Sequence, residues 1–109
     1  MKKILMSALA IAAMTMSANA ACSGSACTNV TVTEVYATFG GTIYISTSGN
    51  EGALTCKSPG NVYVSVGAND PGRNALYSMM LTAKTTKTKV KIRIQEGTDG
   101  CRILYANMK

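Results

Sequence analysis

The sequence lacks the residues on which most enzyme active sites depend. It contains no histidine, so it can form neither a Ser-His nor a Cys-His pair, and the commonest general base is absent. Its five acidic residues are scattered, and the close pair Glu96 and Asp99 falls in a predicted turn. A glycosidase needs two carboxyl groups that face each other across a cleft, and this pattern predicts no such pair. We therefore expect a protein that is not an enzyme and that uses no cofactor.

Aromatic side chains are also scarce. Tryptophan is absent and Phe39 is the only phenylalanine, so the stacking platforms that bind nucleic-acid bases are missing. We do not expect a nucleic-acid partner. Five tyrosines remain, which could stack on sugar rings and offer hydroxyl groups, although each also suits a half-buried position in a strand or helix. They are Tyr36, Tyr44, Tyr63, Tyr77 and Tyr105.

Residues 1–20 have the three parts of a secretory signal peptide. Lys2 and Lys3 give a positive start, an apolar stretch follows at residues 4–16, and Ala18-Asn19-Ala20 supplies small residues at the cleavage positions. The stretch is shorter than the roughly 20 residues that span a bilayer, so we expect no transmembrane segment.

Cleavage after the signal peptide leaves residues 21–109, which is enough chain for one small domain. We predict a bacterial protein that is exported to the periplasm or secreted. The alternative is a lipoprotein anchored through Cys22, but Asn19 is a poor fit to the apolar residue expected three places before such a cysteine.

All four cysteines lie after the predicted cleavage site, and a domain of this size needs the constraint that they can supply. An even number in a short exported chain indicates disulfides. Three pairings are possible. We favour Cys56 with Cys101 as a long cross-link between strands, and Cys22 with Cys27 as a local clasp. A metal site is disfavoured because the chain has no histidine and no paired Cys-x-x-Cys.

Several short runs rich in β-branched residues alternate between apolar and polar side chains, which is typical of strands. Three are predicted at residues 30–39 with a bulge at Glu34-Val35, at 42–47 with Ile43 and Ile45 inward, and at 53–57 with Leu54 and Cys56 on one face. Three more are predicted at residues 62–66 with Val62, Val64 and Val66 inward, at 87–94 with Val90, Ile92 and Ile94 inward, and at 101–108 with Cys101, Ile103 and Tyr105 on one face.

One helix is predicted between the fourth and fifth of these runs. Asp70 suits its N-cap and Pro71 its first position. Tyr77 and Leu81 form a second apolar strip, which either completes a deeply cradled core helix or meets a neighbouring subunit. The main apolar stripe follows the helical i, i+3, i+4, i+7 pattern through Leu76, Met79, Met80 and Ala83.

The order of elements is therefore four strands, one helix and two strands. It predicts a mainly β domain with one helix, stapled by disulfides. The five or six strands form either a small, partly closed barrel or an open antiparallel sheet with the helix across one face.

Positive charge is concentrated after residue 72, and four basic residues alternate along the strand predicted at residues 87–94. Side chains two apart on a strand lie on the same face, roughly 7 Å from each other. The row is either an exposed face protected from edge pairing or a contact surface for an anion such as a sialylated glycan or a lipid headgroup. Its members are Lys87, Lys89, Lys91 and Arg93.

Four features taken together resemble a known family. Thr28-Asn29-Val30 opens the first strand, Cys56 precedes a turn and a valine-alternating strand, and the helical segment 74–83 leads into the strand segment 89–94. This order, over nearly all of residues 21–109, resembles the B subunits of AB5 toxins of the subtilase-cytotoxin and pertussis-like kind.

The resemblance implies an OB-type barrel that assembles as a homopentamer, with the helices lining a central pore. Tyr77 and Leu81 would then contact a neighbouring subunit. Such subunits bind sialylated glycans through a serine or threonine at the start of the first strand, which corresponds here to Thr28.

Two hypotheses follow for function. The first is a carbohydrate-binding subunit of an exported, ring-shaped assembly, with a glycan or glycoprotein as its partner. The second is a periplasmic protein-interaction or inhibitor domain that binds no glycan and docks a protein through its basic strand face or its helix.

Overall fold

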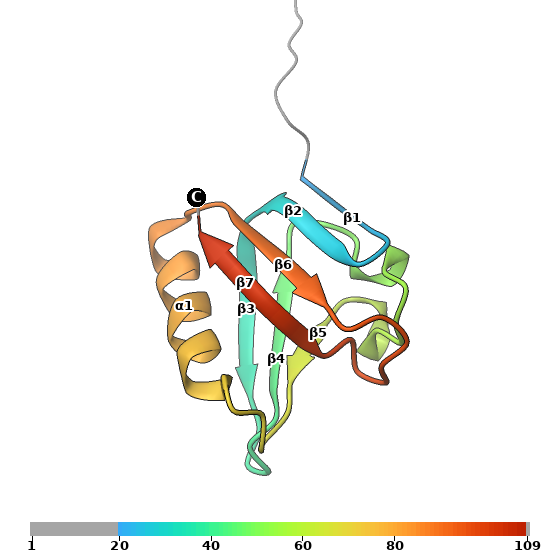
Figure 1. The fold of residues 1–109 in the computed structure, drawn as a ribbon. Helices are drawn as coiled ribbons and strands as arrows, with labels where there is room; N and C mark the ends of the chain where they lie inside the picture. The colour runs from blue at the N-terminus through green and yellow to red at the C-terminus, as the bar shows by residue number, and fades with distance from the viewer. Residues whose placement is uncertain (1–19, 109) are drawn as a thin grey trace, which may run out of the picture.

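Two antiparallel sheets and one helix make up residues 20–108, the part of the chain that the computed structural model describes (Figure 1). The signal-peptide prediction concerns residues 1–20, which lie outside the described residues except for Ala20. Within residues 20–108, no helix is long and apolar enough to cross a membrane.

One sheet has four strands and the other has three. The four-stranded sheet has the order β1-β2-β6-β7, with β1 at Ala21–Ser23, β2 at Ala26–Val30, β6 at Val90–Ile94 and β7 at Ile103–Met108. The three-stranded sheet has the order β3-β4-β5, with β3 at Val32–Ala37, β4 at Ile43–Thr47 and β5 at Val64–Val66. The helix α1 spans Arg73–Thr86, and the short 3-10 helices η2 and η3 span Glu51–Ala53 and Pro59–Asn61.

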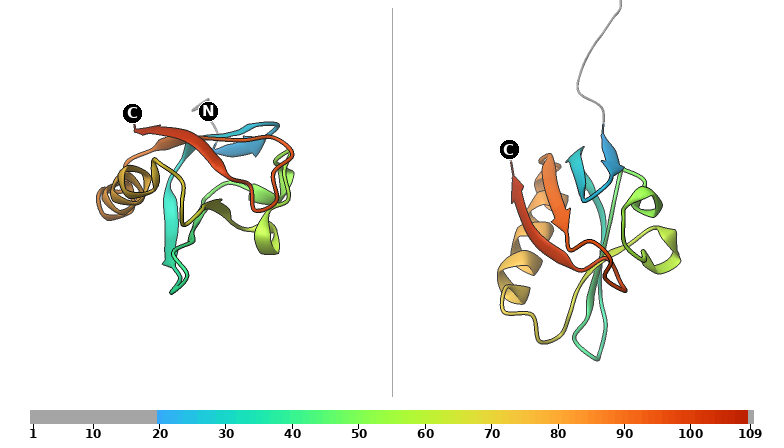
Figure 2. Two further views of the ribbon diagram at one scale, coloured as in Figure 1. Left: turned by 60° about the horizontal axis from the view of Figure 1, so that its bottom comes forward. Right: turned by 45° about the vertical axis from the view of Figure 1, so that its right-hand side comes forward.

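The core lies between the inner faces of the two sheets, which meet at a steep angle, and α1 packs beside β3 and β7 (Figure 2). The mainly β fold with one helix is confirmed. The sheets are not closed into a barrel, so the predicted barrel is not confirmed. The buried strand positions include Ile43, Ile45, Val64, Val66, Val90, Ile92 and Ile94, as the alternation predicted.

The apolar stripe of α1 faces this core. Met80 and Ala83 are fully buried, while Leu76, Met79 and Tyr77 pack partly against the core. The two members of the second strip therefore have different surroundings, because Tyr77 packs partly against the core whereas Leu81 is 40% exposed.

Two strand predictions need correction. The predicted strand at residues 30–39 corresponds to β3, which spans only Val32–Ala37, whereas Val30 is the last residue of β2 in the other sheet; the register shift expected at Glu34-Val35 lies between Val32 and Glu34. The predicted strand at residues 53–57 is wrong. Asn50 caps the 3-10 helix η2 there by accepting a hydrogen bond from the backbone N–H of Gly52, and only isolated bridges follow.

Val62, expected to face inward, is exposed, and Tyr105 does not share the buried face of Cys101 and Ile103. Val62 is 46% exposed because it ends the 3-10 helix η3, so that β5 begins only at Val64. Tyr105 is turned outward by a β-bulge in β7: Ile94 pairs with Ile103 and Arg93 pairs with Tyr105, which leaves Leu104 as an extra residue.

The expected N-cap at Asp70 is wrong. The helix begins at Arg73 after Gly72 and has no side-chain cap. The Asp70 carboxylate instead accepts a hydrogen bond of 2.6 Å from the backbone N–H of Gly67 and pairs with Arg102. Asp70 thus fixes a loop to the start of β7 and does not cap the helix.

Both favoured disulfides are present. Cys22 bonds Cys27 across the antiparallel pair β1–β2, where the two residues are directly opposite. Cys56 bonds Cys101 across a sequence separation of 45 residues. The predicted pairing is therefore confirmed.

Candidate functional site

Three of the five tyrosines form a cluster on the outer face of the three-stranded sheet. Tyr36 on β3 lies directly opposite Tyr44 on β4, and Tyr63 immediately precedes β5. Their ring centroids are 5.6 to 6.0 Å apart, within the range of favourable tilted and edge-to-face contacts. We call this group the tyrosine platform.

The hydroxyl end of the platform is held by an acid. Tyr63 donates a hydrogen bond of 3.0 Å to the carboxylate of Glu34. This bond raises the pKa of Tyr63 above its ordinary value, because the carboxylate accepts a hydrogen bond from the neutral phenol. Both groups lie at the surface, where a ligand hydroxyl can reach them.

The platform borders two adjoining hollows. A pocket of about 260 Å³ is lined by the three tyrosines together with Pro59 and Gly60. A second hollow of about 500 Å³ shares Tyr44, Pro59 and Gly60 with the first, so the two form one groove. Its polar lining groups are Thr42, Lys57, Ser58, Ser65, Asp99 and Arg102.

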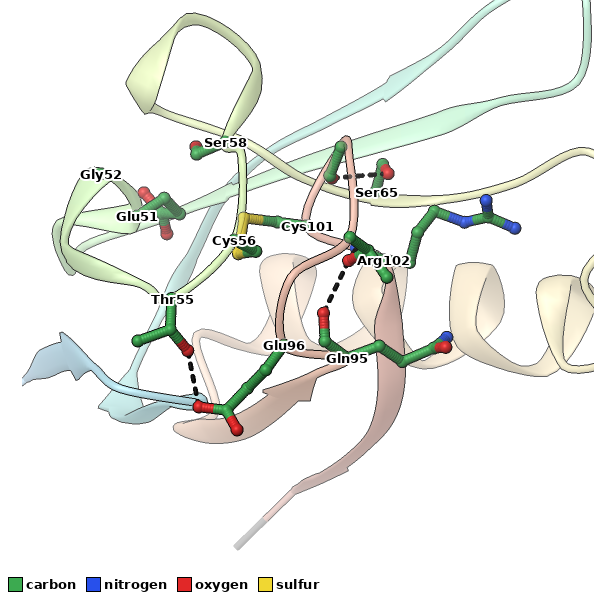
Figure 3. Close-up of a disulfide and its surroundings, with 12 residues drawn as sticks. Glu51, Gly52, Thr55, Cys56, Ser58, Ser65, Gln95, Glu96, Cys101 and Arg102 are labelled. Carbon is green, nitrogen blue, oxygen red and sulfur yellow. Dashed lines mark hydrogen bonds between the residues drawn. A yellow bond between two sulfur atoms is a disulfide. The ribbon is translucent and has the colours of Figure 1, made fainter.

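The disulfide between Cys56 and Cys101 fixes the polar wall of this groove (Figure 3). It joins the segment that carries Lys57 to the loop before β7, where two backbone hydrogen bonds also link Lys57 to residues 98–100. Ser65 of β5 adds a hydrogen bond of 2.7 Å from its hydroxyl to the carbonyl of Gly100. The disulfide and these hydrogen bonds thereby hold the segment at Cys56 and Lys57, the strand β5 and the loop before β7 together at the polar wall of the groove.

Charges in the groove are nearly balanced. Arg102 is paired with Asp70, and its hydrogen bond lowers the pKa of that carboxyl below the ordinary value. This is the one ion pair among residues 20–108. Lys57 is exposed in the groove and takes no part in an ion pair with any described residue, so its ammonium can contact an anionic group of a ligand.

A buried carboxyl group, that of Glu51, lies beside the first disulfide. The carboxylate of Glu51 accepts a hydrogen bond of 3.0 Å from the backbone N–H of Thr47 and another from its hydroxyl, and lies 3.9 Å from the sulfur of Cys22. A disulfide sulfur carries no proton, so this last approach is a packing contact. Cys22, Cys27 and Glu51 are close enough to share a metal ion, but the two sulfurs are bonded to each other and offer no thiolate.

No family model, curated protein or solved structure matches this chain. What the molecule binds is therefore inferred from the chemistry of its own surfaces.

The residue proposed for glycan binding from the sequence, Thr28, lies on the other sheet. It is exposed on β2 and pairs with Ala21 of β1, whereas the tyrosine platform belongs to β3, β4 and the segment before β5. The structure does not bring Thr28 and the platform together, and the role of Thr28 in glycan binding stays a prediction.

The predicted basic row is shorter than expected. Lys87 is the left-handed C-cap of α1, with φ of 57°, and β6 begins only at Val90. Lys89 precedes the strand, and only Lys91 and Arg93 lie on it. Because β6 is paired on both sides, its basic residues do not protect a free edge.

The tyrosine platform was missed as a cluster, although its members were recognised singly as possible sugar contacts. One sequence signal was available: Tyr36 and Tyr44 are equidistant from Gly40, which lies between the strands predicted at residues 30–39 and 42–47, so a hairpin places them opposite each other. The position of Tyr63 was not available, because it depends on η3 and on the loop that the long disulfide holds.

Proposed function

We propose that this protein is an exported, non-enzymatic binding subunit that recognises a glycan in the groove beside the tyrosine platform. The observation that carries the proposal is the contact of three tyrosine rings at the mouth of a polar groove. Sugar rings present apolar C–H faces and a rim of hydroxyls, and binding sites of this kind combine aromatic walls with a few placed polar groups.

The charges of the groove bear on the kind of glycan. Lys57 supports an acidic sugar such as a sialic acid, since its ammonium can pair with a carboxylate. Glu34 at the other end of the platform, together with Tyr63, can accept and donate hydrogen bonds to neutral hydroxyls. A sialylated glycan can use both ends of the site. Its carboxylate would pair with Lys57, and its next sugar ring would cover the tyrosines beside Glu34.

The assembly is part of the same proposal. A ring of five with an OB-like arrangement, as in the toxin B subunits that the sequence resembles, requires contacts between neighbouring subunits. Leu81 supports such a contact because it is an exposed apolar residue on α1. Tyr77 supports it less, since it already packs against the core of its own subunit.

Glycan-array binding with matched variants tests the proposal. Tyr36→Ala and Tyr63→Ala remove stacking surface from the platform and are expected to lower binding by about two- to tenfold each, since one aromatic contact contributes about 0.5–1.5 kcal/mol. Phe39→Ala removes an aromatic ring outside the groove and is expected to leave glycan binding unchanged. If Thr28→Phe abolishes binding while the tyrosine variants retain it, the glycan site lies on the four-stranded sheet and the groove assignment is wrong.

A second function has one specific observation in its favour. Phe39 is fully exposed at the tip of the hairpin between β3 and β4. Isolated aromatic anchors of this kind are common at protein–protein interfaces, so the domain would dock a periplasmic protein or act as an inhibitor. In that case Phe39→Ala abolishes capture of the partner, and no glycan on the array is bound.

A further inference from the structure

The outer face of the four-stranded sheet carries a surface that glycan binding in the groove does not use. Because opposite residues in antiparallel strands share a face, Ala26, Arg93 and Tyr105 form one row across β2, β6 and β7. Lys91 lies on the same face opposite Asn107. The alternating residues of β6 point into the core.

This face has charge of one sign. The sequences of β1, β2, β6 and β7 contain no aspartate or glutamate, while β6 contributes Lys91 and Arg93 and Lys89 adds an exposed ammonium just before it. No acid in these strands offsets the two basic residues on β6. The face therefore suits a negatively charged partner.

The same face also exposes apolar surface. The bulge in β7 sets both Leu104 and Tyr105 across from Arg93, and they are 56% and 43% exposed. Together with Lys91 and Arg93 they make a surface, here called the basic sheet face, in which cationic and apolar side chains are neighbours.

We propose that the basic sheet face rests on a membrane surface rich in anionic phospholipids. Lysine and arginine reach lipid phosphates, whereas leucine and tyrosine favour the boundary between headgroups and acyl chains, so a lipid surface satisfies both kinds of side chain. An acidic polysaccharide would neutralise the charges but would leave Leu104 in water.

The position of the face fits this role. It belongs to the four-stranded sheet, while the tyrosine platform lies on the outer face of the three-stranded sheet, on a different side of the core. A domain lying on a membrane through β6 and β7 keeps its groove open to solvent. The two surfaces can therefore be occupied together, and the membrane proposal does not depend on the glycan proposal.

Vesicle flotation with the purified, disulfide-bonded protein tests the proposal. Phosphatidylcholine vesicles are compared with vesicles in which about one third of the lipid is phosphatidylglycerol. We expect binding only to the anionic vesicles and its loss at high salt. Each basic residue near such a surface changes the partition coefficient by about fivefold, so Lys91→Gln/Arg93→Gln is expected to lower it roughly 30-fold. Leu104→Ser is expected to lower it several-fold.

The matched control is Lys84→Gln/Lys87→Gln, which removes the same charge from the C-terminal end of α1. This pair is expected to keep most of the binding. Equal losses in the two double variants would show that only net charge matters and would overturn the assignment to this face. Unchanged binding of Leu104→Ser, or binding to heparin without binding to anionic vesicles, would equally exclude a lipid surface as the partner.

Discussion

At the scale of single residues, Glu51 is a buried acid that is hydrogen-bonded to the end of a strand. It is 2% exposed, and its carboxylate holds the backbone N–H and the hydroxyl of Thr47 at the end of β4. Burial raises its pKa above the ordinary value of 4.5, although the hydrogen bonds from Thr47 oppose that shift. Glu51 therefore satisfies the polar groups of Thr47 at the end of β4, and the raised pKa of its carboxyl group makes the stability of the protein depend on pH.

The sign of that dependence gives a prediction. The folded state keeps the proton of Glu51 at a pH where the unfolded chain has released it, so the contribution of Glu51 to stability is largest below about 4.5 and is lost as the pH rises through the folded pKa. Glu51→Gln keeps an acceptor for Thr47 but carries no charge. As the pH rises above 4.5, we therefore expect the melting temperature of Glu51→Gln to fall less than that of the wild type.

Thermal unfolding followed by circular dichroism across this pH range measures the difference. Asp70 does not interfere with this measurement. Because its pKa is lowered, its effect on stability changes at pH values below its ordinary pKa of 3.8. Glu51→Ala serves as the reference that removes the acceptor, and it should cost about 1–3 kcal/mol by leaving Thr47 unsatisfied. Parallel pH profiles for the wild type and Glu51→Gln would contradict this role of Glu51.

At the scale of elements, two loops differ in how closely the protein packs around their glycines. A Cβ added to Gly49 would lie 2.7 Å from the sulfur of Cys22 and 3.2 Å from Val30, whereas one added to Gly40 meets nothing within 4 Å. The sulfur cannot move freely because it is bonded to Cys27. We expect Gly49→Ala to destabilise the protein by about 1–3 kcal/mol.

Gly40→Ala is the matched substitution, and it should change stability by less than about 1 kcal/mol, because its added methyl group points into open space. Urea unfolding of both variants gives the two values directly. If Gly49→Ala were as stable as Gly40→Ala, the loop between β4 and η2 could not be packed against the first disulfide as described.

Element prediction worked where one face of a strand is buried and failed where the backbone is irregular. The alternation through Ile43 and Ile45 predicted their burial because a strand facing a core has a period of two. Tyr105 was misplaced because a bulge shifts every later residue to the other face, and no local pattern marks the extra Leu104. Positions such as Asp70 depend on partners far away in the sequence, here Arg102, and local propensity cannot supply them.

At the scale of the whole molecule, the two disulfides should contribute unequally. Cys56 and Cys101 are 45 residues apart and Cys22 and Cys27 only five, so chain-entropy estimates give about 4 and about 2 kcal/mol. Cys56→Ser/Cys101→Ser is therefore expected to be the less stable double variant in urea, and it alone should lose glycan binding, because it frees the polar wall of the groove. A larger loss of stability on removing Cys22 and Cys27 would contradict this order.

The central claim is that a glycan covers the tyrosine platform, and the absence of tryptophan makes it directly observable. Tyrosine fluorescence is not masked by indole emission, and three of the five tyrosines belong to the platform. Titration with a sialylated oligosaccharide should give a saturable change in emission in the wild type, and none in Tyr36→Ala/Tyr63→Ala. A glycan that binds without changing the emission, or an equal change in the double variant, would place the binding site elsewhere on the protein.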